Sequence, residues 1–158
     1  MVKSTLANLS KMKKKSSLPR GLRNNNPLNI RGSKTMWLGQ TGTDGTFCKF
    51  ESMKWGYRAA FRLLHTYRTK YSISSIRNII GRWAPPNENN TQAYIEKVCN
   101  MMGVEPQFCV FAGSFLDEDV YWCCSLVKAM AAVENCIPFK DVEVEPIMDG
   151  YCLAFEAV

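Results

Sequence analysis

Glu134 is the acidic residue whose position in the sequence is best suited to catalysis. It continues a stripe of apolar residues on a predicted helix, formed by Val120, Cys124, Val127 and Ala131, where a carboxylate is unusual. Burial and the partial negative charge of the helix C-terminus both disfavour the ionised form, so we expect a raised pKa for Glu134. A carboxyl that stays protonated near neutral pH can donate a proton to the leaving oxygen of a glycoside. The alternative is a helix-end glutamate that simply reaches solvent.

Two acids near the predicted hairpin are candidates for a second catalytic group. Asp44 stands at the hairpin tip and Glu51 follows the hairpin, and either could act as a base or stabilise a developing cation. Exposed acids near turns usually serve only solubility, and this alternative stays open. If neither acid serves, the acetamide of an N-acetylated substrate could take the role of the nucleophile, as in substrate-assisted glycosidases.

Other catalytic chemistries have little support in the sequence. His65 is the single histidine and lies within a predicted helix, with no serine or cysteine motif to complete a triad. The seven cysteines include no CxxC pair, and no phosphate-binding glycine loop occurs, so we expect neither a metal nor a cofactor. We expect reduced thiols that are mostly small core residues, with no disulfide between Cys123 and Cys124.

The first part of the chain has the composition of a loop followed by a hairpin. Residues 20–33 contain three consecutive asparagines, then Pro27 and Gly32, which favour irregular backbone. The Asp44-Gly45 pair predicts a turn between two short strands, at Thr35–Leu38 and Thr46–Phe50.

The remainder reads as mainly helical. Apolar residues at helical spacing predict four helices, over about 53–70, 74–83, 91–102 and 117–134, with Asn90 or Thr91 capping the third. Residues 103–115 show no pattern, and the tail 139–158 alternates as an extended segment would. These elements predict an α+β fold that is mostly α, with a small β-hairpin lobe.

Positive charge is concentrated at the start of the chain, whose net charge is +6. Residues 1–43 carry nine Lys and Arg and no acid, whereas residues 101–158 carry ten acids and two Lys. Residues 1–19 have little to bury, so we expect a flexible basic arm ahead of a single domain over residues 20–158. The arm is either a solvated tail or a tether for a polyanion such as nucleic acid, anionic lipid or a cell-wall polymer.

Two resemblances bear on function. The segment RGLRNNNPLNIRG, followed by Trp37-Leu38-Gly39, resembles short phage and prophage proteins that open with an Arg-Asn-Asn-Asn-Pro-x-Asn-Ile-Arg motif. This resemblance runs from Arg20 to about Glu134 and includes Trp83-Ala84-Pro85-Pro86. Some members of that group are virion structural proteins, so the resemblance implies a phage or prophage origin.

The second and more distant resemblance is to bacterial β-N-acetylglucosaminidases and lytic transglycosylases. The segment 25–31 is similar to their Asn-Asn-Leu-Phe-Gly-Ile-Lys motif, Phe47–Phe50 to their Phe-Arg-x-Tyr strand, and Asn90-Thr91-x-x-Tyr94 to their Ala-Thr-Asp-x-x-Tyr motif. Their catalytic helix precedes these motifs, whereas here Ala-Met-Ala-Ala-Val-Glu134 comes last, which implies a circularly permuted lysozyme-like fold. Asn135 and Cys136 depart from the Ser and Gly expected after the acid.

The resemblance implies roles for several residues. Glu134 would be the general acid, and Tyr94 would line the cleft beside it, unless Tyr94 is only a core aromatic. Asn25, Asn26 and Asn29 would bind sugar hydroxyl and N-acetyl groups, although asparagine also commonly serves in loops. The rings of Trp37, Trp55 and Trp83 offer flat faces for sugars, or belong to the core.

The expected function is cleavage of β-1,4 bonds between the N-acetylated sugars of peptidoglycan, by a glycosidase or a lytic transglycosylase. The alternative is a non-catalytic virion structural or cell-wall-binding protein, and a nucleic-acid partner is a weaker third. No apolar run could cross a bilayer and no secretory signal is evident. We therefore expect cytoplasmic synthesis and action at the wall after lysis, injection or virion delivery, with virion or secretion-device partners.

The permuted order of the motifs makes one geometric prediction. The loop 24–31 and Tyr94 should approach the C-terminal end of the helix that carries Glu134, although both are distant from it in the sequence. Groups that share one substrate must lie within contact distance of each other or of the reacting atoms.

Overall fold

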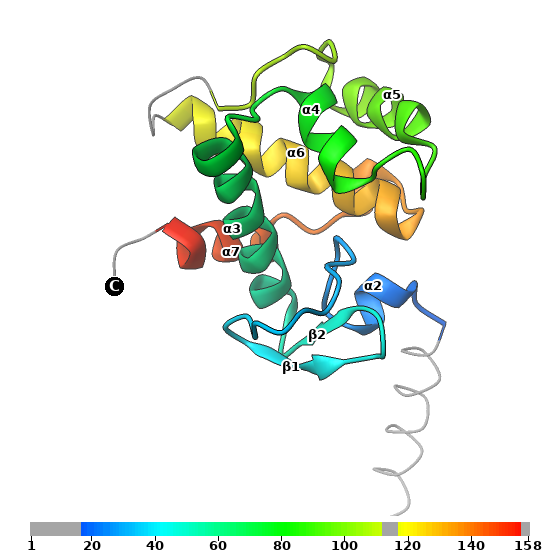
Figure 1. The fold of residues 1–158 in the computed structure, drawn as a ribbon, viewed down its shortest axis with the longest axis vertical. Helices are drawn as coiled ribbons and strands as arrows, with labels where there is room; N and C mark the ends of the chain where they lie inside the picture. The colour runs from blue at the N-terminus through cyan, green and yellow to red at the C-terminus, as the bar shows by residue number, and fades with distance from the viewer. Residues whose placement is uncertain (1–16, 112–116, 156–158) are drawn as a thin grey trace, which may run out of the picture.

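The structure is a computed structural model that describes residues 17–111 and 117–155, with side chains in the second range from residue 119 onward. Its first part contains the short helix α2 and a two-stranded antiparallel sheet (Figure 1). The elements in chain order are α2 (Arg20–Arg23), β1 (Gln40–Thr43), β2 (Cys48–Phe50), α3 (Met53–Tyr71), α4 (Ile76–Trp83), α5 (Thr91–Met102), α6 (Asp117–Asn135), a 3₁₀ turn (Phe139–Asp141) and α7 (Glu145–Phe155). The predicted α+β class with a small hairpin is therefore confirmed.

Helix α6 runs through the middle of the molecule, with α4 and α5 on one side and α2 and the hairpin near its C-terminal end (Figure 1). It is buried on several faces, and its fully or nearly fully buried residues are Leu126, Val127, Ala129, Met130, Ala131 and Ala132. The elements that pack on α6 include α2, α3, α5 and α7. The end of α6 is therefore the point at which segments from both ends of the chain meet.

The four predicted helices are confirmed to within two residues at each end. Two of them begin at side-chain caps, because the Ser75 hydroxyl accepts a hydrogen bond from the Asn78 amide, and Asn90 Oδ1 accepts one from the Ala93 amide. The prediction that Asn90 or Thr91 caps the third helix is confirmed for Asn90. The irregular backbone predicted from residue 103 onward is found as far as Phe111, and residues 112–116 lie outside the described residues.

The predicted strand at Thr35–Leu38 is wrong. The first strand is Gln40–Thr43, which pairs with Cys48–Phe50 and carries a bulge between Gln40 and Gly42. Trp37 closes a turn with Gln40, since its backbone amide donates to Gln40 Oε1 and its carbonyl accepts from the Gln40 amide. This turn prevents a straight strand from continuing through Leu38. The hairpin strands pair from Gln40 to Thr43, and the Asp44-Gly45 turn follows Thr43.

The extended tail predicted over 139–158 is also wrong, because residues 145–155 form helix α7. The buried residues Ile147, Gly150 and Ala154 lie three and four residues apart and face α3. Pro146 occupies the first turn, where a proline is compatible with a helix. The alternation of Val142 and Val144 that suggested a strand ends just before α7 starts.

Two arginines of α3 donate hydrogen bonds to the C-terminal end of α7. Arg58 Nε donates to the carbonyl oxygen of Leu153, and an Arg62 guanidinium nitrogen donates to that of Ala154, both at 3.3 Å. The last carbonyls of a helix lack partners within the helix and carry partial negative charge, so cations bind there favourably. Arg58 and Arg62 are therefore half-buried against the end of α7.

None of the seven cysteines forms a disulfide, and in particular none joins Cys123 to Cys124, as predicted. The expectation that most are core residues is wrong. Cys48, Cys99 and Cys123 are buried, Cys124 and Cys152 are half-buried, and Cys109 and Cys136 are exposed.

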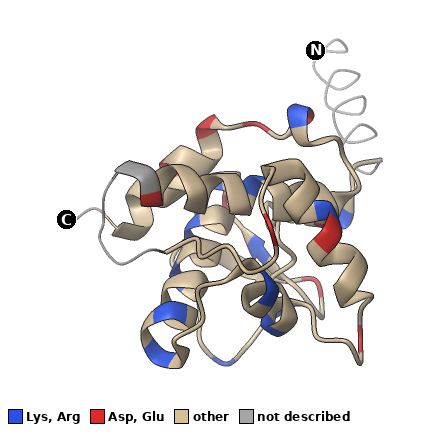
Figure 2. Cartoon of the chain, turned by 90° about the horizontal axis from the view of Figure 1, so that it is seen from above, with Lys and Arg blue, Asp and Glu red and all other residues tan. Residues whose placement is uncertain are grey.

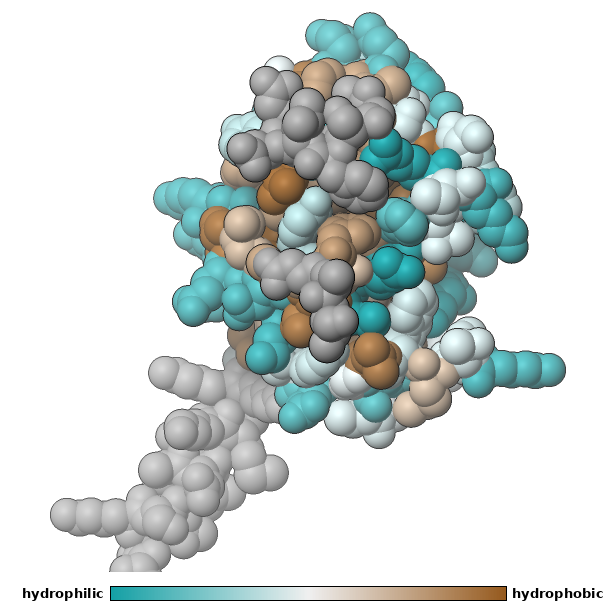
Figure 3. All heavy atoms as spheres, turned by 90° about the vertical axis from the view of Figure 1, so that its left-hand side faces the viewer, coloured by the Kyte–Doolittle hydropathy of each residue, from teal (hydrophilic) through white to brown (hydrophobic). Residues whose placement is uncertain are grey.

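Basic and acidic residues tend to lie in different regions of the molecule, whereas hydrophobic and hydrophilic residues are intermixed. Most Lys and Arg lie in the lower half of the view in Figure 2, whereas several Asp and Glu lie along its upper edge and right-hand side. On the face shown in Figure 3, hydrophobic and hydrophilic residues alternate. Within the described parts of the chain, no helix combines the length and the apolar character that a membrane span requires.

Helix α7 packs on α3 at a small residue. A Cβ atom placed on Gly150 would lie 2.6 Å from Tyr57 Cβ, 2.9 Å from the Lys54 carbonyl oxygen and 3.0 Å from the Arg58 amide nitrogen. On the same interface the Phe61 ring meets Tyr151 edge-on, with 5.3 Å between ring centroids. Backbone atoms cannot yield as a flexible side chain can, so this contact requires glycine.

We expect Gly150→Ala to destabilise the fold by about 1–3 kcal/mol, because the added methyl group pushes α7 away from α3. The matched control is Gly81→Ala within α4, where an added Cβ would meet nothing within 4 Å. There alanine should stabilise the helix by roughly 0.5–1 kcal/mol. Urea unfolding followed by circular dichroism measures both changes, and equal midpoints for the two variants would contradict the close packing of α7 on α3.

Candidate active site

Glu134 lies in the last turn of α6, one residue before the helix ends at Asn135. Both of its carboxylate oxygens accept hydrogen bonds from segments that are far away in the sequence. Asn29 Nδ2 donates to Oε2 at 2.9 Å, and the Tyr94 hydroxyl donates to Oε1 at 3.1 Å. The predicted approach of the loop 24–31 and Tyr94 to this helix end is therefore found in the structure.

The environment of Glu134 favours its protonated form. Burial raises the pKa of Glu134 above its ordinary value, while hydrogen bonds from Asn29, Tyr94 and the Trp83 side chain act in the opposite direction and offset part of the effect. The position at a helix C-terminus adds a further bias against the negative charge. Trp83, which the sequence suggested as a flat face for sugars or a core aromatic, is thus a neighbour of the carboxyl that acts to lower its pKa.

Asn29 is held in place by an unusual loop backbone. Asn25 and Asn29 both adopt left-handed conformations with φ of 51°, which asparagine tolerates better than most residues. Between them, the fully buried Asn26 accepts from the Ile30 amide through Oδ1 and donates through Nδ2 to the carbonyls of Ile30 and Cys48, each at 2.9 Å. The amide of Asn26 therefore fixes the loop on the hairpin.

The same loop is tied to α6 by Asn135. This buried side chain donates through Nδ2 to the Pro27 carbonyl at 2.7 Å and to the Ala131 carbonyl at 2.8 Å. Asn135 therefore clamps the end of α6 to the loop that carries Asn29. In the sequence this residue stands out only as a departure from an expected serine. The sequence feature that could have indicated its role is the position of an asparagine directly after the candidate acid.

Helix α2 approaches this junction closely. A Cβ atom on Gly21 would lie 2.6 Å from Asn135 Oδ1 and 3.0 Å from Asn29 Oδ1, so any other residue would displace both side chains. These two oxygens are buried and make no hydrogen bond with the part of the chain that the structure describes. Each asparagine therefore holds its position through its amide nitrogen and through packing against Gly21.

Tyr94 approaches Glu134 from the first turn of α5. The side chain is buried, and burial followed by the neighbouring Glu134 charge raises the pKa of Tyr94 well above its ordinary value. The phenol consequently stays protonated and acts as a donor to Glu134. The capped start of α5 and the hydrogen bond from the Thr91 hydroxyl to the Ala84 carbonyl fix this turn next to Trp83.

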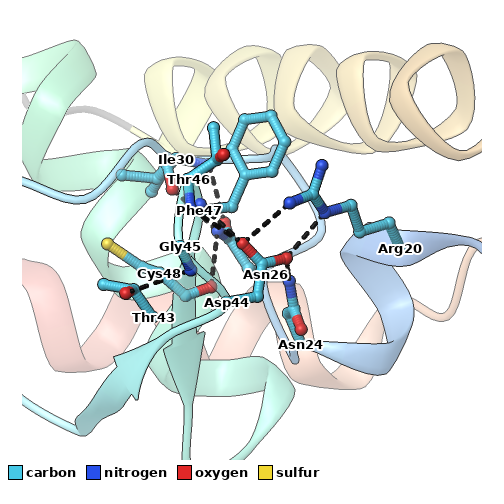
Figure 4. Close-up of polar contacts among 10 residues, drawn as sticks. All are labelled: Arg20, Asn24, Asn26, Ile30, Thr43, Asp44, Gly45, Thr46, Phe47 and Cys48. Carbon is cyan, nitrogen blue, oxygen red and sulfur yellow. Dashed lines mark hydrogen bonds and ion pairs between the residues drawn. The ribbon is translucent and has the colours of Figure 1, made fainter.

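The hydrogen bonds that Asp44 accepts give this residue a structural role (Figure 4). Its carboxylate accepts from Arg20 at 2.6 and 2.9 Å, from Asn24 Nδ2 at 2.8 Å, and from the backbone amides of Thr46 and Phe47. The Arg20 hydrogen bonds, together with those from Phe47 and Asn24, hold the pKa of Asp44 well below its usual range. Such a carboxylate is a weak base, and its bonds join the hairpin turn to α2.

The other predicted site residues lie apart from Glu134. The exposed Glu51 lines a surface hollow together with residues of α7, including Glu145 and Asp149. Asn25 donates to the carbonyls of Phe50 and Glu51, so its amide, like that of Asn26, serves the backbone. Trp37 is half-buried in the turn before β1. Of the predicted residues, the structure brings together Glu134, Asn29 and Tyr94.

The described residues hold no cluster of three or more His, Cys, Asp or Glu side chains that could bind a metal ion. Glu134 and its neighbours form a cluster of one buried acid and neutral hydrogen-bond donors.

The raised pKa of Glu134 predicts a pH-dependent stability cost. Below the pKa of the unfolded state the carboxyl is protonated in both states, and its ionisation costs no stability. As the pH rises, the unfolded state loses its proton first, so stability falls until the pH passes the folded-state pKa. We therefore expect Glu134→Gln, which cannot ionise, to raise the melting temperature relative to wild type more at pH 7 than at pH 4.5. Thermal scans of both proteins across this range measure the difference. A constant difference would contradict a raised pKa.

Comparison with known proteins agrees with a phage association. The chain matches no protein-family profile. It is 41% identical to Protein P5 of Pseudoalteromonas phage PM2 over 121 residues, which cover 73% of this chain and 71% of that protein. An identity of this size over most of both chains means that they share one fold and one ancestor. The chain therefore belongs to the same protein family as Protein P5 of Pseudoalteromonas phage PM2.

Proposed function

We propose that this protein cleaves the β-1,4 glycosidic bonds between N-acetylated sugars in peptidoglycan, with Glu134 as the general acid. The observation that carries the proposal is the contact of Glu134 with both Asn29 and Tyr94. These residues belong to three of the four motifs that resemble the bacterial glucosaminidases and lytic transglycosylases. A chance resemblance of short motifs gives no reason for them to meet at one carboxyl, which supports a circularly permuted lysozyme-like site.

The donors around Glu134 suit a residue that gives up a proton during the reaction. Before transfer, burial keeps the carboxyl protonated to a higher pH than usual. After transfer, the new carboxylate is stabilised by hydrogen bonds from Asn29, Tyr94 and Trp83. Hydrogen bonds to an ionised group are stronger than those to a neutral one, so these donors stabilise the transition state more than the ground state.

The nucleophile in this proposal is the acetamide group of the substrate itself. Asp44 is occupied by Arg20 and Asn24, and Glu51 lines a hollow beside α7, so neither is placed as the base or ion-stabilising group. The acetamide oxygen of the sugar on the donor side can attack the anomeric carbon as the leaving oxygen takes the proton from Glu134. Water or a sugar hydroxyl then attacks the anomeric carbon, its proton returns to the Glu134 carboxylate, and the bond to the acetamide oxygen breaks. Attack by water gives hydrolysis, and attack by a sugar hydroxyl gives transglycosylation.

A phage relative and the charge of the chain support the cell wall as the target. Phage proteins that meet peptidoglycan act during entry or release, and the relationship to Protein P5 is compatible with virion partners. The net charge of +6 favours association with the anionic polymers of a bacterial wall.

The decisive variant is Glu134→Gln, which keeps the size of the side chain and removes the dissociable proton. We expect release of sugar fragments from purified sacculi to fall by about 10²–10⁴-fold, the usual contribution of a general acid. The matched control is Glu51→Gln, the same change at an exposed position, which should retain wild-type activity. Asp44→Asn should lower stability, because it weakens the ion pair with Arg20, while the folded fraction stays active.

The same assay separates the alternatives. Loss of activity in Glu51→Gln or Asp44→Asn but not in Glu134→Gln would move the catalytic centre to the hairpin lobe. Sedimentation with sacculi without any release of sugars, by wild type as well, would favour a non-catalytic virion or wall-binding protein. Binding to DNA that weakens steeply with added salt would favour the nucleic-acid alternative.

The donors to Glu134 should also set the alkaline limit of activity. Removing a hydrogen bond to the carboxylate raises the pKa of Glu134 further, so the acid stays protonated to higher pH. We expect Tyr94→Phe and Asn29→Gly to reduce the maximum rate and to move the alkaline limb of the pH profile to higher pH. Glycine is chosen at position 29 because it tolerates the positive φ. Tyr121→Phe, at an exposed tyrosine, is the control and should leave the profile unchanged.

A further inference from the structure

A second feature of the structure lies beside α7, away from the contacts of Glu134. A hollow of about 400 Å³ has mainly apolar walls, which include Leu18, Leu22, Met53, Ile137, Val142 and Pro146. Asp141 and Glu143 also line it. Leu18 is 43% exposed, although it is a large hydrophobic residue next to this hollow. Apolar surface of this kind is usually covered by another segment or another molecule.

A more open hollow adjoins the first, since Met53 and Pro146 line both. Its other walls include Glu51, Glu145 and Asp149. The two hollows together have five carboxylates among their lining residues, and Lys54 is the one basic residue among them. We name this joint surface the α7 groove. Its charge is opposite in sign to that of the chain as a whole.

Residues 1–16 have the composition that complements the α7 groove. They carry five lysines and no acid, and their larger apolar residues are Val2, Leu6, Leu9 and Met12. The chain leaves this segment at Ser17 and enters the wall of the groove at Leu18. A segment of 16 residues covers about 24 Å even when fully helical, which is enough to follow a surface groove of this size. Direct covalent attachment gives the segment an effective concentration of the order of millimolar.

We propose that residues 1–16 dock in the α7 groove of their own chain. The leucines and Met12 cover the apolar hollow, and the lysines face its carboxylates. The groove also contains Leu22, Asn25 and Ala131, which belong to the segments that carry Asn29 and Glu134. Docking therefore also covers residues of the two segments that carry Asn29 and Glu134. It also keeps the lysines from acting as a free tether for polyanions.

The test is a charge exchange in the full-length protein, followed by hydrogen exchange and mass spectrometry. Asp141→Lys with Glu143→Lys reverses two charges in the groove, and Lys14→Glu with Lys15→Glu reverses two in the segment. Each pair of substitutions should accelerate amide exchange in residues 1–16 and 139–149 by roughly two- to thirtyfold, the effect of losing two surface ion pairs. Combining all four substitutions should restore the wild-type rates.

The matched control is Lys34→Glu with Lys97→Glu, which changes the net charge as the two lysine substitutions in the segment do, but at exposed lysines that do not line the groove. It should leave the exchange rates in both segments unchanged.

Exchange of residues 1–16 at the rate of an unfolded peptide in wild type would overturn the proposal, as would failure of the fourfold variant to restore protection. Protection that disappears on dilution would place the segment on a second copy and overturn docking within one chain. Protection that appears only after addition of heparin would assign the lysines to a polyanion instead. None of these outcomes depends on catalysis, so failure here is distinct from failure of the proposed activity.

Discussion

The burial of one carboxyl at the meeting point of distant segments is the constraint on which the rest of this structure depends. Glu134 closes α6, and its two oxygens are bound by Asn29 from the beginning of the chain and by Tyr94 from α5. An acid in such a place destabilises the fold whenever it is ionised, because burial outweighs the stabilisation from its donors. A residue that costs stability persists where it serves function, which is the physical reason for proposing Glu134 as the catalytic acid.

The asparagines around this carboxyl have different structural roles. Asn26 fixes the loop to the hairpin, and Asn135 fixes the same loop to α6, so Asn29 is free to turn its amide toward Glu134. Asparagine suits each task because its amide offers both donors and an acceptor, and because it tolerates positive φ. Asp44 adds the last connection, since its ion pair with Arg20 ties the hairpin turn to α2. The hairpin thus supports the loop and does not itself carry the acid.

Charge and packing connect the site to the remainder of the molecule. Helix α7 lies on α3 through Gly150, and Arg58 and Arg62 bind its last carbonyls. The acids that precede and begin α7 form the rim of the α7 groove, beside the point where the basic segment 1–16 joins the described chain. The segment between α6 and α7 therefore lines the proposed docking surface and follows directly after the helix end that carries Glu134.

The sequence by itself determined the elements that rest on local pattern. Periodic apolar residues and cap residues defined α3 to α6. The position of Glu134 on an apolar stripe, together with the resemblance of its helix to that of lytic transglycosylases, indicated the candidate acid. The tertiary structure alone decided β1, because the turn that Trp37 makes with Gln40 displaces the strand. It decided α7 as well, whose buried face packs on α3 and α6. It also showed that Asn29 contacts Glu134, whereas Asn25 and Asn26 bind the backbone. The partners of Asn135, Trp83 and Asp44 likewise became known only from the tertiary structure. Those roles depend on contacts between residues as many as 108 positions apart, which no local pattern encodes.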